Sequence, residues 1–338
     1  MTNLERLQST GIRRVGKPQR GFRYVSLNGG RVVKADLDRI KKLRIPPAWT
    51  DVAINPATSG RLQVVGHDAA GRWQYLYHEK HTRIQDAQKF RRLIKFAEAL
   101  PKMRAAINRD LRQPGLTREQ VLAAVLRILS SCFMRPGSEV YASENGSFGI
   151  ATLRSNHIRV KGDTVHFDFP GKSGVRQQRA LRDRRVAKVV RNLLKQPGRR
   201  VFQFTNDSGD SVLVTSRQIN QYIKEIMGDR FSAKDFRTWA GTLICACSLT
   251  RLGTSDEEKL TARKKKIVTA VKETSEALGN TPAVCRGSYI CPAILKAFED
   301  GKSLNNCVLS PEAYLRYRGK GLHPAEKALV RFLKQSAT

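Results

Sequence analysis

A single tyrosine lies in what the sequence predicts to be the first turns of a short helix. The stretch LGNTPAVCRGSYICP spans residues 278–292, and it places Thr281 and Pro282 where the N-cap and the first residue of a helix are favoured. Tyr289 would then lie about two turns into that helix. Its hydroxyl could act as a nucleophile, or its ring could simply pack, and the local sequence is compatible with both.

Four other polar side chains lie at or near predicted ends and turns. Arg135 precedes Pro-Gly at the end of a helical pattern, Lys172 lies in the turn PGKSG, and Asn280 directly precedes the Tyr289 helix. Arg237 lies in the string SAKDFRTWAGT. Each has an ordinary structural explanation, because the helix dipole favours Arg near a helix C-terminus and turns favour Lys and Asn. Taken singly, these residues do not distinguish chemistry from support of the fold.

The charge of the chain predicts a polyanionic partner. In 338 residues, 62 Lys and Arg stand against 29 Asp and Glu, which gives a formal net charge of +33. Residues 1–90 hold 17 of these basic residues and 7 of the acidic ones, so both parts of the chain are basic. A detachable basic tail would instead concentrate the charge in one run. This distribution favours nucleic acid as the partner, although a generally basic surface would look the same.

Cysteine usage and hydropathy favour an intracellular protein without a metal site. The six cysteines are scattered and show no repeated CxxC spacing with matched histidines. We therefore expect reduced and mostly buried thiols, and no metal ligands. The N-terminus lacks an apolar signal core and no apolar run is long enough to cross a membrane, so a cytoplasmic location is expected. The cysteines are Cys132, Cys245, Cys247, Cys285, Cys291 and Cys307.

The elements that must position these side chains fall into two predicted domains. Residues 1–85 are β-rich, with a helix across residues 34–43 and a hairpin in which the turn DAAG joins GRLQVVGH to RWQYLYH. One face of this hairpin could pack while the other meets phosphates, and an ordinary amphipathic hairpin is equally compatible with the pattern. Residues 86–338 are mainly helical, with a small β-hairpin region at about 147–180.

Two helix starts in the second domain are predicted from capping boxes. Thr117 is followed three residues later by Gln120, ahead of the apolar run VLAAVLRIL. Ser255 and Glu258 have the same spacing ahead of LTARKKKIVTAVKETSEAL. We expect both pairs to satisfy the free backbone N–H groups at the start of their helices.

Five strings of the sequence resemble the type IB DNA topoisomerases of the poxvirus-like and bacterial subfamily. They occur in the family's order and extend over nearly the whole chain, which makes the signal far more specific than a short motif. An asparagine at position 280 matches the bacterial subset, because the poxvirus and eukaryotic members typically carry histidine there. The strings are IPPAWTDVAINP with GRLQVVGHDAAGRWQYLYHEKH, FMRPGSEVYASENGSFGIATL, FDFPGKSG, AKDFRTWAGT and LGNTPAVCRGSYICP.

The resemblance implies a catalytic role for each of the five polar residues. Tyr289 corresponds to the nucleophile, Arg135 and Arg237 to the cations that stabilise the transition state, Asn280 to a phosphate hydrogen-bond donor and Lys172 to the general acid. The chemistry is consistent with this, because a tyrosine hydroxyl with a pKa near 10 needs nearby cations to attack at neutral pH. A departing 5′-oxygen likewise needs a proton.

The implied activity is relaxation of positive and negative supercoils without ATP, metal or another cofactor. One strand would be cut through a 3′-phosphotyrosyl bond, the duplex would rotate, and the strand would be religated. The implied fold is α+β, a small β-rich N-terminal domain with a mainly α-helical catalytic domain of the topoisomerase IB/tyrosine recombinase fold, which together form a clamp around duplex DNA. A monomer associated with the nucleoid is expected. Candidate DNA contacts in the first domain are Arg23, Arg72, Tyr75, Tyr77 and Lys80.

Two other functions compete with this interpretation. A tyrosine recombinase shares the catalytic fold and the nucleophile, but recombinases usually carry His-x-x-Arg where this chain has Lys234-Asp235-Phe236-Arg237. A non-catalytic basic DNA-binding protein would explain the charge but not the five strings. Relaxation of a plasmid in EDTA distinguishes all three.

Overall fold

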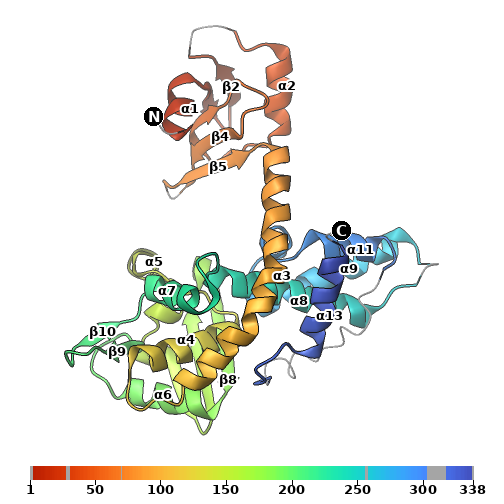
Figure 1. Cartoon of the computed structure of the whole chain (residues 1–338). Helices are drawn as coiled ribbons and strands as arrows, with labels where there is room; N and C mark the ends of the chain where they lie inside the picture. Colours follow the sequence, from red (N-terminus) through yellow and green to blue (C-terminus); the bar gives the residue numbers. More distant parts are fainter. Residues whose placement is uncertain (1–2, 28–30, 70, 256–257, 303–316, 337–338) are drawn as a thin grey trace. The chain divides into compact units, whose positions relative to one another are not determined.

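The chain divides into two compact units in a computed structural model (Figure 1). The structure describes residues 3–27, 31–69, 71–255, 258–302 and 317–336. The first unit is Met1–Lys89 and the second is Phe90–Thr338. The boundary falls within helix α3 (Glu79–Asp110).

The first unit is built on a five-stranded antiparallel sheet with helices against it. The sheet order is β2-β1-β3-β4-β5, and the predicted hairpin is the β4–β5 pair, in which His67 faces Trp73. Alternate residues of β3 serve opposite faces, as expected for a strand. Ile54 packs with Ile40 of α2, whereas Ala53 packs with Leu7 of α1. The elements are α1 (Asn3–Thr10), β1 (Ile12–Lys17), β2 (Gly21–Val25), α2 (Lys34–Lys42), β3 (Thr50–Ile54), β4 (Leu62–His67) and β5 (Trp73–Tyr77).

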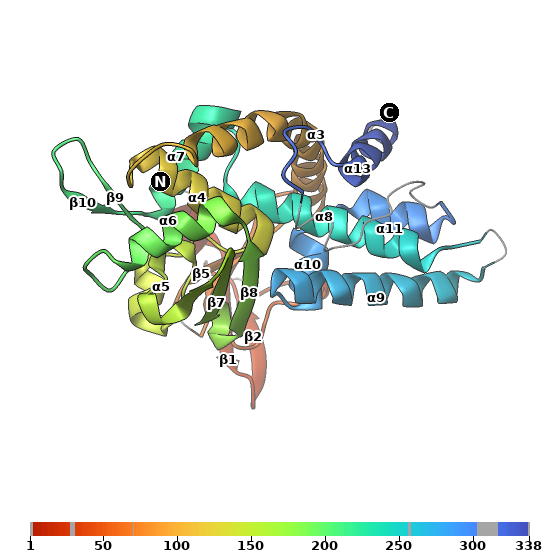
Figure 2. The same ribbon diagram turned by 90° about the horizontal axis from the view of Figure 1, so that it is seen from below.

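The second unit contains a three-stranded antiparallel sheet, β6 (Ile158–Lys161), β7 (Thr164–Pro170) and β8 (Arg176–Arg182). Along β7 the odd-numbered residues are buried and the even-numbered ones are mostly exposed, which is the alternation of a sheet with one covered face. Helices α4 and α6 contact this sheet and each other (Figure 2). The predicted β region at about 147–180 thus supplies β6, β7 and the beginning of β8.

Helices make up most of the remaining second unit. Helices α8 and α9 run alongside each other, and α10 and α11 contact α9 (Figure 2). The elements not yet named are α4 (Arg118–Cys132), α5 (Glu139–Asn145), η1 (Ile150–Thr152), η2 (Ser155–His157), η3 (Lys172–Gly174), α6 (Arg184–Leu194), β9 (Gln203–Thr205), β10 (Ser211–Leu213), α7 (Ser216–Met227), α8 (Ala233–Leu252), α9 (Leu260–Leu278), α10 (Pro282–Ser288), α11 (Pro292–Glu299) and α13 (Pro324–Gln335).

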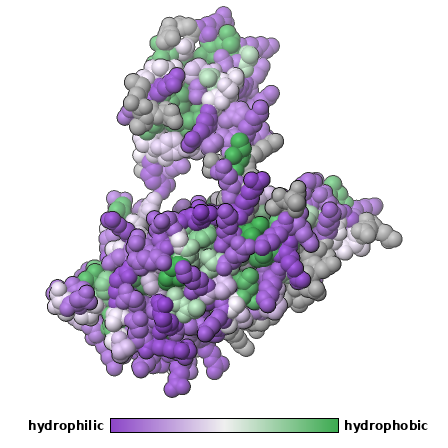
Figure 3. All heavy atoms as spheres, viewed as in Figure 1, coloured by the Kyte–Doolittle hydropathy of each residue, from purple (hydrophilic) through white to green (hydrophobic). Residues whose placement is uncertain are grey.

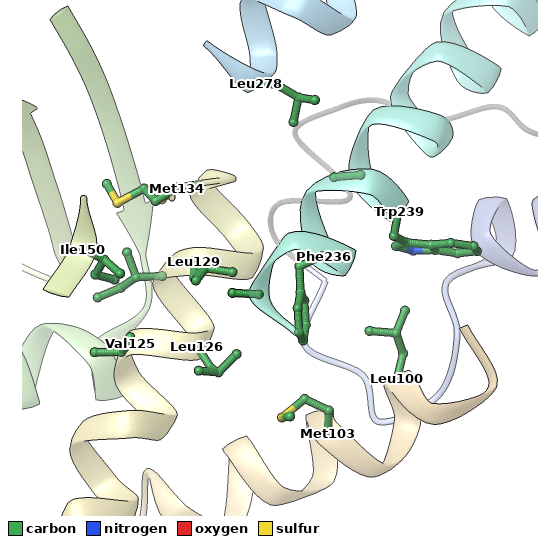
Figure 4. Packing of buried hydrophobic residues seen from close by; sticks show 14 of the residues in the cluster. Leu100, Met103, Val125, Leu126, Leu129, Met134, Ile150, Phe236, Trp239 and Leu278 are labelled. Carbon is green, nitrogen blue, oxygen red and sulfur yellow. The ribbon is translucent and has the colours of Figure 1, made fainter. Parts of the chain in front are cut away.

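The core of the second unit surrounds α4 and the first turns of α8. Every residue of α4 from Gln120 to Leu129 is buried. Phe236 of α8 lies among Leu100, Met103 and the α4 side chains (Figure 4). Its ring meets that of Phe96 edge to face, with the centroids 5.0 Å apart, a favourable geometry for aromatic rings. The start of α8 is therefore held rigidly.

The predicted helix starts have different outcomes. Thr117 does cap α4 by accepting the N–H of Gln120, but the Gln120 amide donates to a loop carbonyl instead of closing the box. The second capping box is wrong, because α9 begins after Lys259 without a side-chain cap. The carboxylate of Glu258 instead pairs with Lys266 at 2.8 Å. The Glu258 carboxylate is therefore engaged by a lysine nearly two turns into the helix and does not cap it.

The α+β class expected from the sequence is confirmed, with an N-terminal sheet and a mainly helical second unit. On the face shown in Figure 3, hydrophilic residues cover most of the second unit. Among the helices of the described ranges, none combines the length and the apolar character needed to cross a membrane.

Candidate active site

The backbone around Tyr289 follows the local sequence closely. Thr281 caps α10 by accepting the N–H of Val284, and Pro282 is the first helical residue, as predicted. The helix is shorter than expected and ends at Ser288, so Tyr289 is its C-cap residue rather than part of its face. The Tyr289 side chain is half-buried against the core of the second unit.

Helix α8 contacts the backbone of Tyr289 directly. The buried Thr242 hydroxyl donates to the carbonyl oxygen of Tyr289 at 3.2 Å and accepts the N–H of Cys291 at 3.2 Å. The neighbouring Gly241 allows this approach, because a Cβ at that position would lie 2.8 Å from the Tyr289 carbonyl oxygen and 3.0 Å from Tyr289 Cβ. The nucleophile candidate is thus attached to a rigid helix.

Arg237 lies in the second turn of α8, and its side chain reaches Tyr289. The residue is only 3% exposed, and its guanidinium donates to the carbonyl oxygens of Phe133 and, at 3.0 Å, of Leu278. Its Nε has no partner among the described residues. The guanidinium carbon lies 5.0 Å from the centroid of the Tyr289 ring. Because its partners are neutral carbonyls, its positive charge remains available to an anion.

Arg135 and Asn280 come from distant parts of the chain and meet through a hydrogen bond. Arg135 donates to the side-chain oxygen of Asn280. The Asn280 Nδ2 is buried and has no hydrogen-bond partner in the described part of the chain. Buried polar groups are nearly always paired, so this orphaned donor indicates a place for a ligand atom.

Two glycines let the Arg135 loop fold tightly against η1. The N–H of Ile150 donates to the Arg135 carbonyl at 2.9 Å. A Cβ at Gly149 would lie 2.7 Å from that carbonyl oxygen, and Gly137 has a φ of +87°, a conformation that favours glycine. The close contact between the segments FMRPG and SFGIAT therefore fixes the backbone from which the Arg135 side chain extends.

The electrostatics of the cluster favour a bound anion. Burial alone would raise the pKa of Tyr289, but the charges of Arg237, Arg135 and Lys234 outweigh it, together with a hydrogen bond from Arg237. The pKa of Tyr289 therefore lies below its ordinary value. Burial first, and then the charge of Arg237, lower the pKa of Arg135. No carboxylate among the described residues pairs with either arginine.

Lys172 lies apart from these four residues. It begins the single turn η3 at the tip of the β7–β8 hairpin and is exposed. In the described structure it makes no hydrogen bond or ion pair with the other four. The base of its hairpin is nevertheless close to the site, because Gly171 and Gln177 line the same small cavity as Arg135 and Arg237. The structure thus brings together four of the five candidates and leaves Lys172 on a projecting tip.

The candidate DNA contacts of the first unit are exposed side chains. Arg23 lies on β2 and Lys80 in the first turn of α3. Tyr75 and Tyr77 lie on one face of β5, 40% and 45% exposed, with their rings stacked at 6.4 Å. The charge of Arg72 is already paired with Asp68 at 2.7 Å in the β4–β5 turn.

Three residues at the site were missed by sequence reasoning. Gly241 and Thr242 stand directly in the AKDFRTWAGT string, yet nothing local indicates that they contact Tyr289. Arg179 lines the cavity shared by Arg135 and Arg237. In the sequence it is one of many arginines, so only the pairing of β8 with the rest of the sheet reveals its place.

The cysteines of the described residues are buried, free thiols. They are Cys132, Cys245, Cys247, Cys285 and Cys291. Burial raises the pKa of Cys132 and Cys245 to about 12. Cys307 lies outside the described residues. In the part of the chain that the structure covers, no three His, Cys, Asp or Glu side chains gather as metal ligands would.

The chain is similar in sequence to known DNA topoisomerases. Residues 78–300 match the catalytic core of eukaryotic DNA topoisomerase I, and residues 21–68 match the N-terminal domain of bacterial DNA topoisomerase IB. DNA topoisomerase 1B of Acanthamoeba polyphaga mimivirus is 35% identical over 297 residues, covering 86% of this chain and 88% of the viral protein.

More distant relatives show the same pattern. DNA topoisomerase 1B of vaccinia virus (strain Copenhagen) is 25% identical over 271 residues, covering 79% of this chain and 83% of that protein. DNA topoisomerase 1 of Xenopus laevis is 24% identical over 262 residues, covering 68% of this chain and 30% of the longer frog protein. The resemblance seen in the five strings is confirmed by these matches. The catalytic-core match covers well over half of the chain and the mimivirus relative is similar over nearly its full length, so this chain belongs to the type IB DNA topoisomerase family.

Proposed function

We propose that this chain relaxes supercoiled DNA by cutting and rejoining one strand, with Tyr289 as the nucleophile. The observation that carries the proposal is the cluster around this tyrosine. Two guanidiniums that pair with no carboxylate among the described residues, and a buried amide donor that has no partner there, lie beside a hydroxyl whose pKa is lowered. Such an arrangement suits a phosphate group, which would supply the missing negative charge and hydrogen-bond acceptors.

The proposed reaction exchanges one phosphoester bond for another. The Tyr289 oxygen attacks phosphorus, a bond from phosphorus to that oxygen forms, and the bond to the 5′-oxygen of the next nucleotide breaks. The tyrosine proton is lost to solvent or a neighbouring base, and the departing 5′-oxygen takes a proton from Lys172. Because the number of phosphoester bonds is unchanged, religation is the reverse step and requires no ATP.

The remaining residues would stabilise the transition state. Negative charge builds up on the non-bridging oxygens at phosphorus, and aimed donors in a site shielded from water stabilise it strongly. Arg237 and Arg135 would supply guanidinium forks, and the free Nδ2 of Asn280 would donate the further hydrogen bond. Lys172, on its exposed tip, could reach into a DNA groove while the rigid cluster holds the phosphate.

A plasmid relaxation assay tests the proposal. We expect the protein to relax both positive and negative supercoils in EDTA without ATP, and to form a covalent protein–DNA complex on denaturation with detergent. Tyr289→Phe, which removes only the hydroxyl, should abolish both activities while DNA binding remains. Binding without relaxation by the unaltered protein would refute the enzymatic function, and site-specific strand exchange would instead indicate a recombinase.

We further propose duplex DNA, preferentially supercoiled, as the substrate of a monomeric protein at the nucleoid in the cytoplasm. The first unit would contribute contacts to phosphates and bases through Arg23, Lys80 and the exposed stacked pair Tyr75 and Tyr77. Arg72 is a weaker candidate because Asp68 already neutralises its charge. Alanine substitutions should weaken DNA binding at Lys80 more than at Arg72, as measured by fluorescence anisotropy.

A further inference from the structure

Arg179 of β8 is a half-buried cation whose partners are all neutral. Its guanidinium donates to the carbonyl oxygen of Gln178 at 3.0 Å, to the side-chain oxygen of Gln177 at 3.1 Å and to the carbonyl oxygen of Ala277 at 3.2 Å. No ion pair with a carboxylate is formed by this residue in the described ranges. Burying a charge without a counter-charge is costly, so its presence requires an explanation.

The partners of Arg179 lead directly to Asn280. Ala277 is in the last turn of α9, which ends at Gly279 in the left-handed conformation, with a φ of +61°. Gln177 packs against that glycine so closely that a Cβ there would lie 2.3 Å from the Gln177 side-chain oxygen. The turn that presents Asn280 is therefore held on one side by Gln177 and Arg179.

The guanidinium of Arg179 also lies close to the arginines beside Tyr289. It lines one cavity together with Arg135 and Arg237. Burial and then the charge of Arg237 lower the pKa of Arg179, and Arg179 in turn lowers the pKa of Arg135. Three guanidiniums that repel one another, with no acidic partner in the described part of the chain, are stabilised when an anion binds among them.

We propose that Arg179, seated with Gln177, is a positioning residue that aims the Asn280 amide at the scissile phosphate and adds a third positive charge to the phosphate site. This inference rests on the proposed strand-cleavage function. A neutral residue of similar length, such as glutamine, could fill the same space and donate to the Ala277 carbonyl oxygen, but it would not bring a positive charge to the phosphate site.

Single-turnover cleavage of a nicked DNA substrate tests this role, because the cut strand dissociates and only the forward step is measured. We expect Arg179→Gln to slow cleavage by about 10- to 100-fold, the size of effect that a misplaced catalytic group produces. The Kd for DNA should change by less than about 3-fold. The control is Arg182→Gln, an exposed arginine on the same strand, which should cleave at the unaltered rate.

A double-mutant cycle with Asn280→Ala distinguishes positioning from a general structural effect. If Arg179 acts through Asn280, Arg179→Gln should slow the Asn280→Ala protein by a smaller factor than it slows the unaltered protein, because the group it aims is already absent and only the contribution of its charge is lost. Arg179→Lys keeps the charge but not the fork, so it should recover part of the rate. If Arg179→Gln does not fold, the double-mutant cycle with Asn280→Ala can be carried out with Arg179→Lys instead.

Three results would overturn the inference. These are cleavage by Arg179→Gln at the rate of the Arg182→Gln control, an equal loss with and without Asn280, or a loss confined to DNA affinity. Each of them requires that the unaltered protein cleaves DNA. If the unaltered protein forms no covalent complex, the proposed function itself fails together with this inference.

Discussion

Replacing Gly241 with alanine adds only one methyl group, yet it should slow DNA cleavage by about 10- to 100-fold. The added Cβ would lie 2.8 Å from the Tyr289 carbonyl oxygen, and 3.0 Å from both Tyr289 Cβ and Leu278 Cδ1. Carbon atoms in contact are normally about 3.5–4.0 Å apart, so Tyr289 must move away by roughly half an ångström. Helix α8 cannot move in compensation, because Phe236 and Trp239 of the same helix are packed in the core (Figure 4).

Stability and catalysis should respond differently to this change. Alanine in a helix interior is favoured over glycine by about 1 kcal/mol, whereas overpacking a core costs about 1–3 kcal/mol. The net loss in free energy of unfolding is therefore about 0–2 kcal/mol. Cleavage is more sensitive, because displacing a reacting group by an ångström can cost about 100-fold, so we expect a loss of about 10- to 100-fold.

Single-turnover cleavage and denaturant unfolding measure the two effects separately. Gly287→Ala is the matched control, because it lies in α10 two residues from Tyr289 and its added Cβ would meet no atom of the described residues within 4 Å. This control should gain about 0.5–1 kcal/mol of stability and cleave normally. If Gly241→Ala cleaves like the control, the close contact between α8 and the tyrosine does not set the position of the nucleophile.

Three further predictions concern the same site. Thr242→Val leaves the backbone groups of Tyr289 and Cys291 unpaired, so its free energy of unfolding should fall by about 1–3 kcal/mol for each group, and cleavage should slow. Thr242→Ser keeps the hydroxyl and should keep most of the cleavage rate, so equal rates for the two variants would contradict this role. Cleavage needs the phenolate, and the pKa of Tyr289 is lowered, so the single-turnover rate should rise with pH and level off below pH 10. Arg135→Gln removes one of the charges that lower the pKa of Tyr289, so the pH at which the cleavage rate levels off should rise. An unchanged pH profile would refute the electrostatic role of Arg135. DNA affinity should fall about 1,000-fold or more between 50 and 200 mM salt if six or more phosphates are neutralised, and a flat titration would exclude that binding mode.

Local elements were predicted best where short-range chemistry determines them. The Thr281 cap with Pro282 at the first helical position appears in the structure as expected, and so does the helix LTARKKKIVTAVKETSEAL. The capping box before that helix failed because the Glu258 carboxylate found Lys266 instead. A charged side chain with several partners within reach is not assigned by spacing alone.

The sequence by itself determined the family, the basic character and the identities of the candidate catalytic residues, because these depend on residue types in order along the chain. Only the tertiary structure decided which of those residues meet. Arg135 and Asn280 are 145 positions apart and share a hydrogen bond, whereas Lys172 stays on an exposed tip. The contacts of Gly241, Thr242 and Arg179 were likewise decided by helix packing and strand pairing, which bring together segments that no local pattern connects.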